Sequence, residues 1–175
     1  SLMVDQLGGS RYARTNPLPR GIAPGCLGSG RGFYHAIMEG AANHYTLAQR
    51  EAWASALPRT AEAWMARQTI HSTLVAECDG HCIGFCERDL PAGRIETLYV
   101  WPSVARQGVG SRLLSLSIEA LREAGHGEAM IEASLVLAPS LAGRGWATLG
   151  EEWSERQGER LPRVRMRLAL DAGDT

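Results

Sequence analysis

The 175-residue chain contains 18 arginines and no lysine, so each of its basic side chains other than histidine is a guanidinium. The missing lysine excludes mechanisms that require that side chain: a phosphate-loop NTPase, a pyridoxal Schiff base, a serine–lysine dyad and a protein-kinase strand lysine. The formal net charge of −1 also argues against nucleic acid as a partner, because a nucleic-acid-binding surface carries an excess of basic side chains.

Long hydrophobic runs are missing as well. No segment reaches the ~18 apolar residues that a membrane-spanning helix requires, and the arginine-containing N-terminal segment lacks the apolar stretch of a secretory signal. We therefore expect a cytoplasmic protein that does not bind a membrane. Ser1 and Leu2 precede Met3 and resemble the remnant of an expression tag.

Cysteine is scarce, but three of the four cysteines lie close together, at Cys78, Cys82 and Cys86. Two apolar-rich runs flank Asp79-Gly80, which is a strong signal for a two-residue hairpin turn. Cys82 and Cys86 then lie about 13 Å apart along one strand, whereas zinc ligands lie within about 2.3 Å of the metal. We predict buried free thiols with neither a metal site nor a disulfide, and reduced thiols suit the cytoplasm.

The length of the chain predicts one domain rather than two. Residues 3–32 contain seven glycines and three prolines without a clear period. We therefore expect a loosely structured, flexible arm over residues 1–27, the tag remnant included, and a single domain over residues 28–171.

Hydrophobic periodicity locates the elements of this domain. Helices are predicted near residues 33–43, from the capping box Thr46-x-x-Gln49 to residue 54, near 60–64, over 108–124 and near 139–144. Strands are predicted as a hairpin over 69–89 and then at 94–101, 128–137, 146–153 and 162–170. The crossover from strand 94–101 through helix 108–124 should pair its two strands in parallel.

The turn before helix 108–124 reads PSVARQGVG over residues 102–110. Its glycines allow a ligand to approach the backbone, and the first amides of the helix attract an anion, most often a diphosphate. A plain strand-to-helix turn is the alternative, because a short Gly-x-Gly is a weak signal. A dinucleotide site would need a third glycine where Leu113 stands. Among phosphate-binding loops, the sequence therefore leaves one that binds diphosphate through backbone amides.

The run LYVWPSVARQGVGSRLL, over residues 98–114, resembles the acetyl-CoA-binding motif of the GNAT superfamily of N-acetyltransferases. The resemblance extends from about residue 33 to residue 170 and includes HYTLAQREAW, VAECDGHCIGF and the late Gly145-Trp146. It implies an α+β (mixed α/β) fold with a splayed mixed sheet of about six to seven strands flanked by helices. It also implies acetyl-CoA as co-substrate, with Leu98, Tyr99 and Val100 beside the pantetheine arm and the amides of Arg106, Gln107, Gly108, Val109, Gly110 and Ser111 around the pyrophosphate.

Two departures from the family pattern concern catalysis. Ala105 stands where the motif usually begins with glutamine or arginine, and Leu141 aligns with the tyrosine commonly assigned as general acid for the leaving thiolate. Leucine cannot donate a proton. Because a thiol pKa of about 8.5 makes thiolate a tolerable leaving group, we expect slower catalysis rather than none.

Glu96 is the candidate catalytic base, since an acceptor amine with a pKa of about 10.4 must lose a proton before it attacks. Strict strand alternation places it on the face of Leu98 and Val100. A solvated carboxylate, or one paired with an arginine, is the alternative. His44 and Tyr45 border the predicted acceptor side, where packing is the commoner role of a tyrosine beside a helix.

Two further features have a structural and a functional interpretation. Trp53 is favoured as a core residue over a residue that stacks on substrate. The arginines at 163, 165 and 167 are favoured as a solvated strand face over a patch for an acidic substrate.

The leading hypothesis is an enzyme that transfers an acetyl group from acetyl-CoA to a primary amine of a small molecule or peptide by direct nucleophilic attack. An acyl-CoA-binding protein with little or no catalysis is the alternative, motivated by Ala105 and Leu141. A doubly wound nucleotide-binding domain is a third hypothesis, and it would have a wholly parallel sheet. A homodimer is the assembly that soluble oligomers adopt most often.

Overall fold

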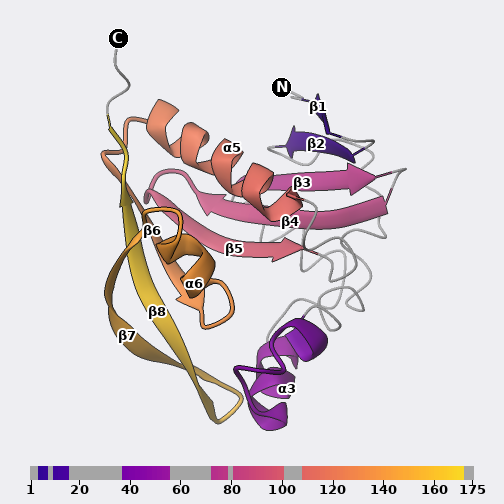
Figure 1. Cartoon of the computed structure of the whole chain (residues 1–175), viewed down its shortest axis with the longest axis vertical. Coiled ribbons are helices and arrows are strands. Elements are labelled where there is room, and N and C mark those ends of the chain that lie inside the picture. Colours follow the sequence, from indigo (N-terminus) through magenta and orange to yellow (C-terminus); the bar gives the residue numbers. More distant parts are fainter. Residues whose placement is uncertain are drawn as a thin grey trace.

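The computed structural model of the chain describes residues 4–7, 10–15, 37–55, 72–78, 81–100 and 108–171 (Figure 1). Within these ranges eight strands form one sheet in the order β1-β2-β3-β4-β5-β6-β8-β7. The strands are β1 Val4–Leu7, β2 Ser10–Thr15, β3 Ser72–Cys78, β4 His81–Asp89, β5 Arg94–Val100, β6 Glu128–Ser134, β7 Ala147–Arg156 and β8 Glu159–Ala169. The helices are α3 Leu47–Ser55, α5 Val109–Glu123 and α6 Ala138–Ala142, and residues 37–40 are also helical.

The sheet is mixed, as the sequence predicted. β5 and β6 pair in parallel across the crossover through α5, and the other described pairs are antiparallel. This arrangement confirms the α+β class. It also excludes the wholly parallel sheet of a doubly wound nucleotide-binding domain.

The N-terminal residues differ from the expectation of a loosely structured arm, which is wrong for residues 4–7 and 10–15. These residues form β1 and β2, an antiparallel pair that continues the sheet beyond β3. Pairing with β3 provides hydrogen-bond partners for the backbone of β2, a tertiary effect that local glycine content does not reveal. The two strands also raise the count above the expected six to seven. The boundary expected near residue 27 lies outside the described residues.

Helix α5 follows from its apolar stripe. Val109, Leu113, Leu114 and Leu121 are buried on one side of the helix, which packs on β3, β4 and β5. The helix starts after Gly108 in the left-handed conformation (φ +80°), and the left-handed residue 125 (φ +91°) follows its end. Both ends match the predicted span of 108–124.

Helix α3 begins with the predicted capping box. The Thr46 amide donates to Gln49 Oε1 at 3.0 Å, and the Gln49 amide donates to Thr46 Oγ1 at 3.1 Å. Two amides at the helix start thus gain acceptors from side chains. The helix packs against β8, which brings it to the open side of the sheet.

The two halves of the sheet diverge after a short junction. β5 and β6 pair only at Arg94–Met130 and Ile95–Ile131, and Figure 1 shows β5 running across the molecule while β6 turns downward. The gap between them opens toward α3. The main core lies beneath α5 and α6 and includes Ile95 and Ile131 at that junction.

In the β3–β4 hairpin, Cys78 pairs with His81 and Glu77 pairs with Cys82. Cys86 is a fully buried free thiol, as predicted. No group of three metal-binding side chains occurs within the described ranges. None of the described helices combines the length and the hydropathy needed to span a membrane.

Candidate functional site

A cavity of about 460 Å³ occupies the place where β5 and β6 diverge. We call it the cleft. This volume lies within the range of small-molecule sites. Its walls come from four strands and from the segment around α3, and they are formed by Tyr45, Trp53, Glu96, Thr97, Leu98, Tyr99, Ile131, Glu132, Ser134, Leu137, Ser154, Arg156, Leu161, Pro162 and Arg163.

A bulge in β5 decides which side chains face the cleft. Thr97 pairs with Glu87 of β4 and Ile95 pairs with Arg88, so that Glu96 is an extra residue in β5. Ile95 and Leu98 both pack in the core although they are three residues apart, which strict alternation does not allow.

Glu96 therefore shares its face with Thr97 and Tyr99, and the expectation that it shares a face with Leu98 and Val100 is wrong. The bulge still directs the Glu96 carboxylate into the cleft.

The sequence left two roles open for Glu96, a base in the cleft and a carboxylate paired with an arginine, and its position fits both. Its side chain lines the cleft and is about a quarter exposed (26%). It is also paired with an arginine, because Arg94 Nε donates to Glu96 Oε1 at 3.3 Å. The guanidinium holds one carboxylate oxygen and leaves the other for a ligand.

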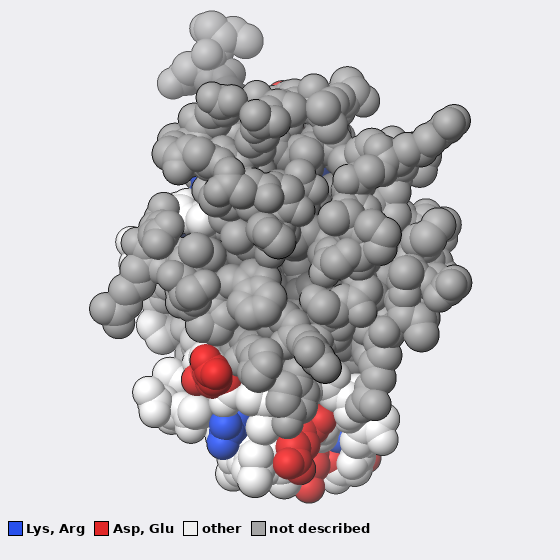
Figure 2. Space-filling model, turned by 90° about the vertical axis from the view of Figure 1, so that its right-hand side faces the viewer, with Lys and Arg blue, Asp and Glu red and all other residues white. Residues whose placement is uncertain are grey.

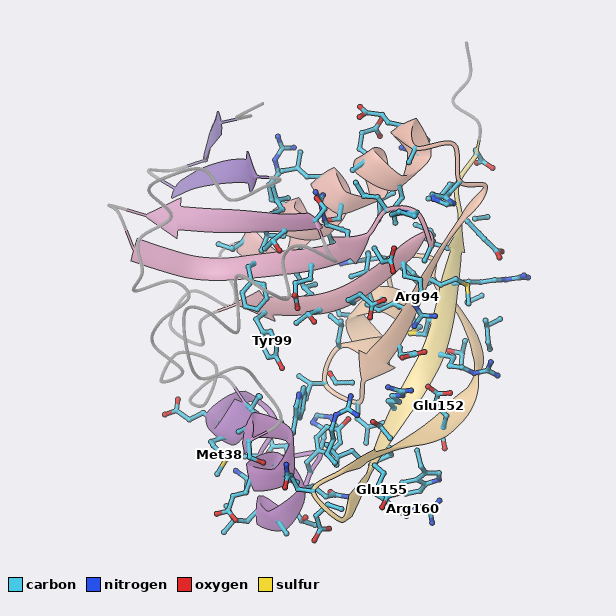
Figure 3. The ribbon with its side chains drawn as sticks, turned by 180° about the vertical axis from the view of Figure 1, so that it is seen from behind. Met38, Arg94, Tyr99, Glu152, Glu155 and Arg160 are labelled. Carbon is cyan, nitrogen blue, oxygen red and sulfur yellow. The ribbon has the colours of Figure 1, made fainter. Side chains whose placement is uncertain are left out.

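Behind Glu96, ion pairs continue across the sheet. Arg94 lies 2.6 Å from Glu132 of β6, and Arg163 of β8 lies 3.1 Å from the second oxygen of Glu132. Arg163 also contacts Glu152 of β7 at 2.6 Å. Figure 3 labels Arg94 and Glu152 on this face. We call the connected set the ion-pair ladder: Glu96, Arg94, Glu132, Arg163, Glu152 and Arg165.

The arginine face on β8 was expected to be solvated, and Arg165 and Arg167 are exposed as expected. Arg163 is half-buried instead, because it pairs with Glu132 and Glu152 of the neighbouring strands. Opposite charges across adjacent strands stabilise a sheet. The hydrogen bond that Arg94 donates to Glu132 raises the pKa of Arg94 further, so its guanidinium stays charged.

Aromatic rings form the wall between β5 and α3. The Trp53 ring lies 5.4 Å from Tyr45 and 6.5 Å from Tyr99, measured between centroids, and Phe85 lies 5.5 Å behind Tyr99. Figure 3 shows Tyr99 extending from β5 toward α3. Trp53 was favoured as a core residue, and it packs against the buried cluster of Ala41, Tyr45 and Leu161, but its half-buried side chain also lines the cleft.

Tyr45 has a structural role, as favoured from the sequence, because its hydroxyl hydrogen-bonds two backbone groups. Its hydroxyl donates to the Pro162 carbonyl at 2.7 Å and accepts from the Leu135 amide at 2.9 Å. Burial raises the pKa of the phenol, against a smaller opposing effect of the Leu135 amide. The single Tyr45 proton is therefore already donated, although the ring lines the cleft.

Leu141 does not face the cleft. Its side chain is fully buried in the main core. The polar group that the sequence analysis missed is Ser134, at the end of β6. Its Oγ accepts from the Leu137 amide at 3.2 Å, which leaves the hydroxyl proton available to a ligand in the cleft. No motif marked Ser134, because its position depends on where β6 ends.

The start of α5 is suited to an anion. The first helical bond runs from the Arg112 amide to the Gly108 carbonyl, so the amides of Val109, Gly110 and Ser111 have no acceptor within the helix. No side chain caps this end, no acidic residue lies in the first turn, and the space beside Gly108 is open.

A cation adjoins these amides, because Arg144, which follows α6, donates to the Ser111 hydroxyl. Arg144 was also missed, since it lies 33 residues from Ser111 in the sequence. The residues present thus fit a diphosphate near the helix start. Arg106 and Gln107, which were predicted to share this role, lie outside the described residues.

Comparison with known proteins gives a consistent result. The sequence model of the acetyltransferase (GNAT) family matches residues 38–142. A GCN5-related N-acetyltransferase from Rhodopseudomonas palustris is 27% identical, with a TM-score of 0.79 over 91% of this chain and 94% of that one. No curated protein sequence matches the chain significantly.

Two more distant structures contain the cofactor. YncA, a putative acetyltransferase from Salmonella typhimurium with acetyl-CoA, is 21% identical, with a TM-score of 0.59 over 96% of this chain and 98% of that one. The PaiA N-acetyltransferase of Thermoplasma acidophilum in complex with coenzyme A is 16% identical, with a TM-score of 0.61 over 81% and 90%. At these identities the likeness concerns the fold.

Proposed function

Because this chain belongs to the acetyltransferase (GNAT) family, it is an enzyme that transfers an acetyl group from acetyl-CoA, and we propose that its acceptor is a primary amine of a small molecule or peptide, which attacks the thioester directly. The observation that carries the proposal is the cleft at the β5–β6 divergence, with the Glu96 carboxylate in its wall and unpaired amides at the start of α5.

The proposed cofactor residues divide into two groups. Leu98 and Tyr99 lie in the cleft wall and Val100 ends the same strand, and we propose that these three residues flank the pantetheine arm. The residues 108–111 offer amides to the pyrophosphate, and Arg144 adds a positive charge there. When bound, acetyl-CoA supplies the activated acetyl carbonyl and a thiolate leaving group.

Glu96 accepts the proton of the amine in this proposal. The amine nitrogen forms a bond to the acetyl carbon, the carbon–sulfur bond breaks, and the proton passes from nitrogen to the Glu96 carboxylate and then to solvent. Arg94 fixes one oxygen of that carboxylate, so the other is held toward the cleft. Positioned proton transfer of this kind contributes about 10²- to 10⁴-fold to a rate.

The leaving thiolate receives no proton from the position of the family tyrosine, because Leu141 is buried in the core. Among the donors that line the cleft, we assign the Ser134 hydroxyl as the group that hydrogen-bonds the sulfur anion, because its oxygen is fixed by the Leu137 amide. A hydroxyl of this kind stabilises the anion without protonating it, which agrees with a slower enzyme rather than an inactive one.

Glu96→Gln tests the base. We expect kcat/KM for a primary amine to fall by about 10²- to 10⁴-fold at neutral pH, since the amide cannot accept the proton. Glu151→Gln is the matched control, because Glu151 is exposed on β7 and does not line the cleft. Steady-state release of coenzyme A over a range of pH measures both variants, and an unchanged Glu96→Gln profile would rule out the assignment.

The alternative weighed from the sequence, an acyl-CoA-binding protein with little or no catalysis, is disfavoured by membership of the acetyltransferase family. Calorimetry with acetyl-CoA and coenzyme A release with a panel of amines separate the two. Tight binding without release from any amine supports binding alone, whereas amine-dependent release supports transfer.

The proposal includes a cytoplasmic location and a homodimer. The free thiol of Cys86 supports a reducing compartment. Light scattering of the purified chain measures the mass of the assembly, and a monomer at all concentrations contradicts the homodimer.

A further inference from the structure

One charged side chain of the cleft differs from the others. Glu96, Glu132 and Arg163 all belong to the ion-pair ladder, so their charges are compensated. Arg156 also lines the cleft, but it forms no ion pair with any carboxylate of the described residues. Its recorded contact is a hydrogen bond from Nη1 to the Glu155 carbonyl at 3.3 Å. The cleft therefore has one uncompensated positive charge.

The backbone holds Arg156 in a defined place. It is the last residue of β7 and pairs with Glu159 across a two-residue turn, yet it makes no ion pair with that carboxylate. Residues 157 and 158 both have positive φ, +49° and +78°, which is the conformation of a type I′ turn. Such a turn fixes the register of the hairpin.

The hairpin is also anchored to α3. Gln49 Nε2 donates to the Arg160 carbonyl at 2.9 Å, and the Tyr45 hydroxyl donates to the Pro162 carbonyl at 2.7 Å. Figure 3 shows Arg160 at the hairpin tip, and Figure 2 shows acidic and basic side chains mixed at the lower end of the molecule, where α3 lies. The backbone that carries Arg156 is thus fixed before a ligand arrives, which lowers the entropic cost of binding, while its exposed guanidinium is free to turn toward the ligand.

The cleft between Arg156 and the ladder is partly apolar. Glu152, Ser154 and Arg156 alternate on one side of β7, so Arg156 lies about 13 Å along the strand from the ladder residue Glu152. Leu161 and the ring of Trp53 line the same cleft. A ligand that extends along it meets a carboxylate base at one end, an apolar and aromatic middle, and a guanidinium at the other end.

We propose that Arg156 selects the acceptor: the amine acetylated by this enzyme carries a carboxylate at the far end of an apolar or aromatic spacer. The inference rests on the proposed function and adds the class of acceptor. A guanidinium binds a carboxylate through two parallel hydrogen bonds. The same charge repels an acceptor that carries a second ammonium group, because the cleft carboxylates are already compensated by the ladder.

Matched acceptors test this proposal. Hexylamine, 6-aminohexanoate and 1,6-diaminohexane share a spacer and differ only at the far end. For the wild type we expect kcat/KM, from coenzyme A release, to be roughly ten- to a hundredfold higher for 6-aminohexanoate than for hexylamine, the range of a hydrogen bond to a charged group. 1,6-Diaminohexane should be the poorest of the three.

Variants assign the preference to one residue. Arg156→Gln should remove the advantage of 6-aminohexanoate over hexylamine, and Arg156→Glu should reverse the order in favour of 1,6-diaminohexane. Arg160→Gln is the control, because Arg160 lies at the same hairpin tip but stacks on Trp153 at 5.0 Å and does not line the cleft. It should keep the wild-type preference.

The two proposals fail in different ways. Absence of coenzyme A release with every amine contradicts acetyl transfer, and calorimetry of 6-aminohexanoate against hexylamine with coenzyme A present then tests Arg156 by binding alone. Equal kcat/KM for the three acceptors, or a preference that survives Arg156→Gln, overturns the inference while transfer stands.

Discussion

At the scale of single residues, Tyr45 connects three segments of the chain through one hydroxyl group. Tyr45→Phe removes the acceptor of the Leu135 amide and the donor to the Pro162 carbonyl. Because these backbone groups then lack their partner, we expect the free energy of unfolding to fall by about 1–3 kcal/mol. Urea denaturation measures the change, and a loss below about 0.5 kcal/mol would contradict this role.

Cys86 gives the fold a dependence on alkaline pH. Burial raises the pKa of its thiol to about 11, against smaller lowering effects of Ser117 and Arg88. Between the ordinary thiol pKa of about 8.5 and pH 11, the folded chain keeps a proton that the unfolded chain has lost. Stability from this group is complete below the lower value and declines as the pH rises toward 11.

Cys86→Ala isolates that effect. The difference in unfolding free energy between wild type and variant should shrink as the pH rises from 8 to 11, since the variant has no thiol to titrate. Urea denaturation at several pH values measures it. A difference that stays constant with pH would show that Cys86 does not carry the effect.

The site residues show where prediction from sequence ends. Glu96 was identified because it precedes the cofactor motif, but its face depends on a bulge that no residue of β5 signals. Arg165 and Arg167 of β8 are exposed as predicted, but the pairing of Arg163 was not foreseen, because its carboxylate partners lie on β6 and β7. Both differences concern contacts between segments that the local pattern does not connect.

At the scale of elements, the turn at Gly93 controls the junction of β5 and β6. Gly93 has a φ of +72°, and a Cβ there would lie 3.0 Å from Nδ1 of His126. Its carbonyl accepts the Met130 amide at 3.0 Å. Gly93→Ala should therefore destabilise the fold by about 1–2 kcal/mol for the left-handed backbone alone.

Gly127→Ala is the matched control for this prediction. A Cβ at residue 127 meets nothing within 4 Å, and its φ is not in the left-handed range. Thermal unfolding of both variants makes the comparison. Equal stability of the two would contradict strain at Gly93.

Elements with a local signal were predicted well. The apolar stripe of α5 and the capping box of α3 are each complete within a short stretch of the sequence, and both appear as expected. Strands β1 and β2 lack such a signal, because β2 is held by pairing with β3 some 60 residues later and β1 by pairing with β2. Local pattern thus identified helices more completely than edge strands.

At the scale of the molecule, binding of acetyl-CoA should stabilise the folded chain against thermal unfolding. A ligand that binds only the folded state at 100 times its Kd adds about 2.7 kcal/mol, which raises the Tm by several degrees. The shift should be smaller in Gly108→Ala, because a side chain strains the left-handed backbone of residue 108 (φ +80°), where the proposed cofactor amides begin. Thermal unfolding with and without acetyl-CoA measures both, and equal shifts would exclude the α5 start as the cofactor site.

The splay of the sheet was predicted from the family resemblance and not from hydrophobic periodicity. Hydrophobic pattern predicted that β5 and β6 are parallel neighbours, but it gives no reason for their pairing to stop after two residue pairs. The acceptor end was still less predictable, since Arg156, Trp53 and Glu96 come from three distant parts of the chain. Their proximity is a property of the whole fold.

The ion-pair ladder has a chemical consequence for an enzyme that holds a reactive thioester. Lysine ammonium groups in the same positions would lose protons from time to time, and each free amine would be a nucleophile beside the acyl donor. Guanidinium groups remain protonated and do not attack, because their pKa lies far above neutral pH. The charged wall of the cleft is therefore inert toward acylation, so that the enzyme does not gradually modify its own site during turnover.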